Sequence, residues 1–186
     1  FGPTSLSATP WNNITSHQES STTSWIKDVE NNYTNIGVRV LDGFTATHAG
    51  VGSEPASPVT VDGVEFPLTA WKDGLLVKGE KNQGDVGPGR IEISQLDVAR
   101  KYNFTILAIR FNGSKDARIS SYKLVGKTES AVKEVKTGIK DAASFAAANF
   151  EEYIAKFENV EPDSEGKVIV EVKGLDTGSA AGGHIN

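Results

Sequence analysis

Apolar and polar residues alternate with a period of two in several short segments, and turn sequences separate these segments. The clearest case is 167–173, where Val168, Val170 and Val172 fall on one face. A period of two is that of a β-strand, whose successive side chains point to opposite faces of a sheet. Turns spaced about 8–12 residues apart are typical of β-sandwiches and barrels. The pattern predicts strands at about 36–41, 90–94, 102–111, 118–125 and 167–173.

Two of these regions carry further signals. Apolar residues occupy both faces of 102–111, so we expect this strand to be covered on both sides and central in its sheet. The residues Asp62-Gly63 stand between two valine-rich runs and predict a hairpin over 59–66. Strands do not alternate with helices along the chain, which argues against a parallel α/β sheet.

The Ala-rich segment 141–160 fits two structures. The spacing of Phe150, Tyr153, Ile154 and Phe157 suits a helix, and alternation over the same residues suits a strand. We favour a strand at about 152–159, because the segment lies within a series of strands and turns.

Composition limits the classes of function. The 186 residues can bury a hydrophobic core without disulfide bonds. The net charge is −5 and Lys and Arg are scattered among more numerous acids, so nucleic acid is not an expected partner. The absence of cysteine excludes disulfides, thiolate metal ligands and a cysteine nucleophile. No apolar run reaches the length of a membrane-spanning helix, so we expect no membrane span.

The chain shows no repeat and no linker, and we interpret 1–186 as a single β-sandwich domain. Residues 3–35 are rich in Ser, Thr and Asn and are interpreted as a long N-terminal loop region. The chain begins at Phe1 rather than Met, and we expect that its start has been removed.

Short motifs occur in a characteristic order along the chain. They are Phe1-Gly2-Pro3 with Trp11-Asn12-Asn13, Leu41-Asp42-Gly43-Phe44, Gly89-Arg90-Ile91-Glu92-Ile93, Tyr102-Asn103-Phe104, Asp116-Ala117-Arg118, Glu161-Pro162-Asp163 and His184-Ile185-Asn186. In this order they resemble the galactose-binding-like, jelly-roll β-sandwich domains of secreted bacterial polysaccharide-degrading proteins, which serve as carbohydrate-binding modules.

The resemblance implies an all-β, two-sheet antiparallel jelly-roll sandwich whose first and last strands pair. It also implies a bacterial protein of polysaccharide utilisation that is secreted, periplasmic or at the cell surface. Because fold alone does not transfer function, the function depends on the residues of a site.

Catalytic and metal-binding patterns are weak in this sequence. No Gly-x-Ser-x-Gly nucleophile elbow occurs, and His17, His48 and His184 lack metal-ligand spacing. Carboxylates are too numerous for a catalytic pair to be chosen, and the acidic stretch 161–165 is most simply a turn. We therefore predict no catalytic residue, no metal ligand and no cofactor; a structural calcium ion would suit the architecture but no residues predict one.

Sugar recognition combines an aromatic ring, which covers the C–H face of a pyranose, with planar amides or guanidinium groups that bond to hydroxyls. Loop residues of these types are the predicted ligand contacts: Trp11, Asn12, Trp71, Arg110, Arg118 and His184. All but Trp71 are expected to converge at one end of the sandwich. The competing interpretation is that Trp11 caps the core and that Arg118 only pairs with Asp116.

The sequence thus predicts a non-catalytic module that binds carbohydrate. A structural spacer that packs against a neighbouring domain or protein is the first alternative, and a carbohydrate-active hydrolase is the second. A binding module should expose an aromatic platform, a spacer an apolar patch, and a hydrolase two converging carboxyl groups with shifted pKa values.

Overall fold

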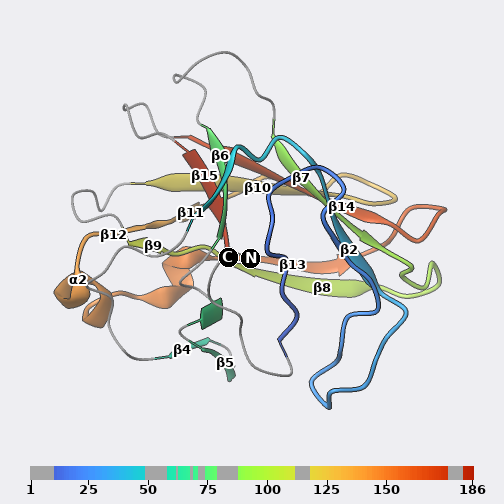
Figure 1. The fold of residues 1–186 in the computed structure, drawn as a ribbon, viewed down its shortest axis with the longest axis horizontal. Coiled ribbons are helices and arrows are strands. Elements are labelled where there is room, and N and C mark those ends of the chain that lie inside the picture. The colour runs from blue at the N-terminus through green and yellow to red at the C-terminus, as the bar shows by residue number, and fades with distance from the viewer. Residues whose placement is uncertain are drawn as a thin grey trace.

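Antiparallel β-strands make up nearly all of the regular structure (Figure 1). The computed structural model describes residues 11–48, 58–61, 63–67, 69–70, 74–78, 88–111, 118–175 and 182–186. The prediction of an all-β antiparallel sandwich is confirmed, while the jelly-roll strand order stays a prediction.

The larger layer is a six-stranded sheet in the order β1-β2-β7-β14-β10-β11, in which every neighbouring pair is antiparallel. Its strands are β1 (Thr22–Thr23), β2 (Gly37–Asp42), β7 (Gly89–Ser94), β14 (Val168–Gly174), β10 (Ile119–Val125) and β11 (Lys133–Lys136). Four of them lie within a residue or two of the strands predicted from alternation, because one face of each strand is apolar.

The opposing layer is built from two groups of strands. The first has the order β15-β6-β3, with β3 (Ala46–His48), β6 (Gly74–Lys78) and β15 (Gly182–Ile185). The second pairs β8 (Tyr102–Leu107) with β13 (Ile154–Val160). Asn186 links them, because its backbone N–H donates to Leu107 O (3.4 Å) and its Oδ1 accepts from Ile109 N (2.5 Å).

The main core lies between the two layers. Buried valines of β14 pack with Tyr122 of β10, Val77 of β6 and Phe157 of β13 in one apolar cluster. The layers lie close together at Gly174, where an added Cβ would lie 2.3 Å from Gly182 C. A side chain at this position would force the β14 and β15 backbones apart, which explains the glycine.

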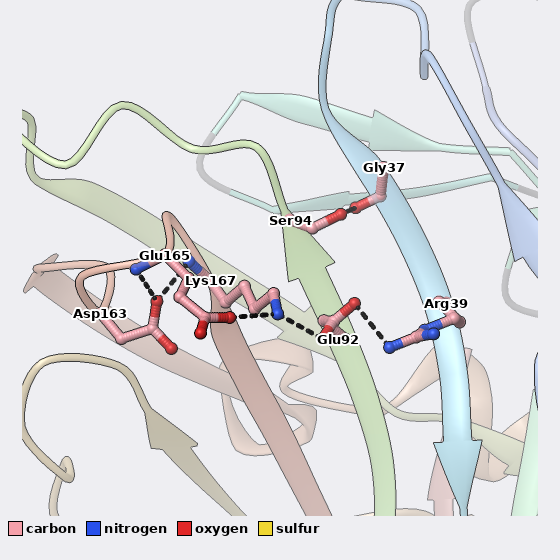
Figure 2. A network of polar contacts seen from close by, with 7 residues as sticks. All are labelled: Gly37, Arg39, Glu92, Ser94, Asp163, Glu165 and Lys167. Atoms are coloured by element: carbon pink, nitrogen blue, oxygen red, sulfur yellow. Dashed lines mark hydrogen bonds and ion pairs between the residues drawn. The ribbon is translucent and has the colours of Figure 1, made fainter.

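The outward face of the six-stranded sheet carries cross-strand ion pairs. Glu92 lies 3.1 Å from Arg39 on β2 and 3.8 Å from Lys167, and Lys167 also contacts Glu165 (Figure 2). Asp163 Oδ1 accepts the backbone N–H groups of Glu165 and Lys167, both at 2.9 Å. These two bonds close the turn that was expected at 161–165. One apolar and one charged face is the usual arrangement of an antiparallel sheet with one side in water.

A second apolar cluster explains why 102–111 is apolar on both faces. Ile106 and Ala108 belong to the main core, whereas Leu107 and Ile109 pack with Phe145 and other residues on the opposite side. This side is covered by the hairpin of β4 (Val59–Val61) and β5 (Val64–Phe66), by α2 (Ala142–Ala146), and by β12 (Gly138–Ile139), which pairs with β9 (Arg110–Phe111). The hairpin at 59–66 is therefore confirmed.

The expected central position of 102–111 needs a correction. Within the described part of the chain, β13 is the one strand that pairs with β8, and on the other side Asn186 N donates to Leu107 O at the end of β8. Asn103 and Thr105 are exposed, so covering on both faces holds only for 106–109. The apolar run continues past the end of β8 at Leu107 to the start of β9 at Arg110. Alternation of apolar residues does not reveal where one strand ends and the next begins.

The segment 141–160 contains both of the structures considered for it. It forms α2, then the 3-10 helix η1 (Phe150–Tyr153), and then β13 at Ile154–Val160. Asp141 caps α2, because its side chain accepts from Ser144 N at 2.8 Å. The favoured strand is confirmed, but it begins two residues later than expected because Tyr153 closes the helical turn.

The expected pairing of the first and last strands involves residues 1–10, which lie outside the described residues; the last strand, β15, pairs with β6. From Trp11 to Asn35 the chain holds β1 and an isolated bridge between Lys27 and Tyr33. Among the described residues, no helix has the length and apolar character needed to cross a membrane.

Candidate functional site

Trp11 and Asn12 lie at a pocket of about 290 Å³ between the layers. Trp11 is half-buried, and its ring centroid lies 5.5 Å from that of Phe66 on β5. Asn12 is exposed and makes two hydrogen bonds of 2.8 Å with the backbone of Lys27, accepting from its N–H and donating to its carbonyl. Two of the predicted residues therefore share one site.

Arg110 and Arg118 form a second group. Arg118 is 3% exposed, and the structure places it near enough to Arg110 for their charges to interact. Burial, and then the charge of Arg118, lower the pKa of Arg110 to about 10. Thr137 links their backbones, since Arg110 N donates to Thr137 O (2.6 Å) and Thr137 N donates to Arg118 O (2.8 Å). Neither arginine lines the pocket of Trp11.

His184 lies inside the molecule rather than at a surface. It is 1% exposed on β15, its backbone N–H donates to Ser120 Oγ at 3.0 Å, and its carbonyl accepts from the hydroxyl of Tyr122. Burial raises the pKa of Tyr122. A Cβ at Gly74 would lie 2.5 Å from the His184 ring, so the glycine makes room for the imidazole. Trp71, the remaining predicted contact, lies outside the described residues.

Among the described residues, the most exposed aromatic side chains lie on a hairpin that is not among the sites predicted from the sequence. Trp25 is 62% exposed, Tyr33 is 72% exposed, and Val29 between them is 89% exposed. We call residues 25–34 the aromatic hairpin; it is the blue loop that projects at the lower right of Figure 1. The sequence could not predict this hairpin, because an exposed ring in a Ser/Thr/Asn-rich segment gives no periodic pattern of apolar residues.

The aromatic hairpin is held by hydrogen bonds along its length. Thr34 N donates to Ile26 O (2.8 Å), and Asp28 N donates to Asn32 O (2.9 Å). Asp28 Oδ1 accepts from Glu30 N (2.9 Å) and Asn32 N (2.8 Å), and these bonds, that to Asn32 first, lower the pKa of Asp28. These hydrogen bonds hold the backbone that carries the two exposed rings.

Two further contacts fix the aromatic hairpin and its rings. Lys27 Nζ lies 4.8 Å from the centre of the Tyr33 ring, a cation–π distance. Asn12 clamps the backbone of Lys27, and the side chain of Ile26 lines the pocket beside Asn12. The same loop therefore carries the exposed rings and, through Ile26, part of the pocket lining.

Trp25 has a backbone φ of 57°, in the left-handed region. This conformation is uncommon for a bulky residue and costs stability, and residues held in such conformations cluster at functional sites.

Carboxyl groups are the side chains on which a glycoside hydrolase or a metal site of this chain would depend. Among the described residues, hydrogen bonds from backbone N–H groups lower the pKa values of Asp28 and Asp141, and Lys127 and Lys101 lower that of Glu161. No group of three or more His, Asp or Glu side chains in the described ranges could hold a metal ion.

Comparison with protein-family models finds no match to this chain, and searches of curated proteins and of solved structures find none either. The resemblance to galactose-binding-like domains therefore stays an expectation from the sequence.

Proposed function

We propose that this protein is a non-catalytic module that binds carbohydrate on the aromatic hairpin. The observation that carries the proposal is the exposure of Trp25 and Tyr33 on a loop fixed by hydrogen bonds. Flat rings that keep their place in water can cover the C–H face of a sugar ring at a small cost in entropy.

The polar surroundings of the rings suit a glycan. Glu30, Asn31 and Asn32 are exposed on the same hairpin, and carboxylates and amides bond well to sugar hydroxyl groups. Arg118 and His184 are buried, so they have no part in this surface, and their predicted contacts with a ligand stay predictions. The setting we propose is that implied by the sequence resemblance, a bacterial protein of the periplasm, cell surface or exterior.

The test is binding to a panel of plant and host glycans, measured by calorimetry. We expect at least one glycan to bind saturably, and Trp25→Ala and Tyr33→Ala each to weaken it by about tenfold, the loss of one stacked ring. Val132→Ala, which removes an exposed apolar side chain outside the hairpin, is the control and should leave affinity unchanged. Affinity that survives both ring substitutions contradicts the proposal.

The absence of catalysis is tested separately. Glycans that bind should be recovered intact after prolonged incubation with the protein. Product that forms with the native chain and no longer forms after substitution of one carboxylate would establish a hydrolase instead.

A second candidate is packing against a neighbouring domain or protein, which the exposure of Val29 favours, because an aliphatic side chain offers no stacking face. Under that function no glycan binds, and Val29→Ser weakens the protein contact. Under glycan binding, Val29→Ser has little effect on affinity.

A further inference from the structure

The pocket beside Trp11 is bounded by both layers of the sandwich. Val38, Ile93 and Val170 come from the six-stranded sheet, Phe104 and Ile106 from β8, and Ile185 from the end of β15. We propose that this pocket is a second binding site, which takes a small, neutral and largely apolar molecule. This proposal goes beyond glycan binding at the aromatic hairpin and does not depend on it.

Size supports a ligand rather than a packing defect. Protein interiors leave few voids larger than a water molecule. An apolar cavity of about 150 Å³ holds one benzene ring. The pocket of about 290 Å³ has room for a bicyclic aromatic compound or a short acyl group.

The lining selects for the absence of charge. Every described side chain of the pocket lining is uncharged, and most are aliphatic or aromatic. A charged group that entered would lose its hydration with no opposite charge among these residues, which is costly. The pocket therefore favours a neutral ligand over an ionised one of the same shape.

The polar groups of the lining mark where the pocket opens. Asn12 and Thr105 are exposed, whereas Ile91, Ile106 and Val170 at the inner end are buried. The amide of Asn12 is fixed by Lys27, and that of Asn186 by Ile109 N. An amide and a hydroxyl at the opening suit a ligand whose polar end is a hydroxyl, ester or amide.

The experiment compares two probes of one shape and different charge. The native chain is titrated at pH 7 with 2-naphthol, which is neutral, and with 2-naphthoate, which is an anion. We expect saturable binding of 2-naphthol at one site and affinity for 2-naphthoate at least about tenfold lower. Absence of saturable 2-naphthol binding, or equal affinity for both probes, overturns the proposal.

A matched pair of variants locates the site. Val38→Phe adds a ring to the pocket wall and should lower affinity for 2-naphthol by at least about tenfold, whereas Val98→Phe, at an exposed position outside the pocket, should not. Unchanged affinity in Val38→Phe overturns the proposal.

A second measurement on the native chain covers the case in which Val38→Phe fails to fold. Nuclear Overhauser contacts should join 2-naphthol to the methyl groups of Ile106 and Val170. Contacts confined to other methyl groups contradict the site. Trp25 and Tyr33 do not line the pocket. Their Ala variants should therefore bind 2-naphthol as the native chain does, whether or not they bind glycan, so the two proposals can fail separately.

Discussion

Trp25 combines a left-handed backbone with an indole that is 62% exposed. For an L-residue this conformation costs about 1–2 kcal/mol, and only glycine adopts it without a steric penalty. Nothing in the amino-acid sequence marks this position, because tryptophan is not a residue of left-handed turns. The sequence therefore predicted ligand contacts at Trp11 and Trp71, and it did not predict the exposed ring of Trp25.

Two substitutions at Trp25 separate backbone strain from ring contacts. Trp25→Gly and Trp25→Ala both remove the indole, but only Ala retains a Cβ. We expect the Gly variant to exceed the Ala variant by about 1 kcal/mol in free energy of unfolding, measured by urea denaturation. An Ala variant at least as stable as the Gly variant would show that position 25 carries no strain.

The strands and the aromatic hairpin differ in how well the sequence predicts them. Alternation located β7, β10 and β14 within a residue or two, because burial of one face forces a period of two. The aromatic hairpin is held instead by the side chain of Asp28 and by the clamp of Asn12 on Lys27, fifteen positions away. Local alternation carries no information on such side-chain contacts.

The hairpin should respond to acid through Asp28. Its pKa is lowered in the folded chain by hydrogen bonds, first that from Asn32 N, so the folded hairpin favours the carboxylate. The stabilisation is complete above the ordinary Asp value of 3.8 and is lost as pH falls through the lowered pKa. The amide proton shift of Asn32, followed by NMR, should titrate with a midpoint below 3.8, and Asp28→Asn should abolish the titration. A midpoint at or above the ordinary value would mean that these bonds do not hold the loop.

At the scale of the whole molecule, the two groups of strands in the smaller layer meet at Asn186. The sandwich class followed from the spacing of strands and turns, but the pocket did not, since Trp11, Phe104 and Ile185 are brought together only by the fold. Distant segments leave no shared pattern in the sequence from which their meeting could be predicted.

Removing the Asn186 side chain tests this junction. Ile109 is 1% exposed, and its backbone N–H donates to Asn186 Oδ1 at 2.5 Å. The substitution Asn186→Ala removes this acceptor. We expect the free energy of unfolding to fall by about 1–3 kcal/mol, the cost of a buried donor left unpaired. Asn103→Ala, which removes an exposed acceptor of Asn159 N, is the matched control and should cost less than about 1 kcal/mol. Equal losses in the two variants would contradict a structural junction at Asn186.

The central claim is that glycan binds on the aromatic hairpin, and the indole N–H signals of the tryptophans report on it directly. Trp25→Phe assigns the signal of Trp25, and Trp11→Phe assigns that of Trp11. Addition of a glycan that binds in the calorimetric panel should shift the Trp25 signal and leave that of Trp11 in place, because Trp11 faces the pocket beside Phe66. A shift of the Trp11 signal with that of Trp25 unmoved would contradict the account.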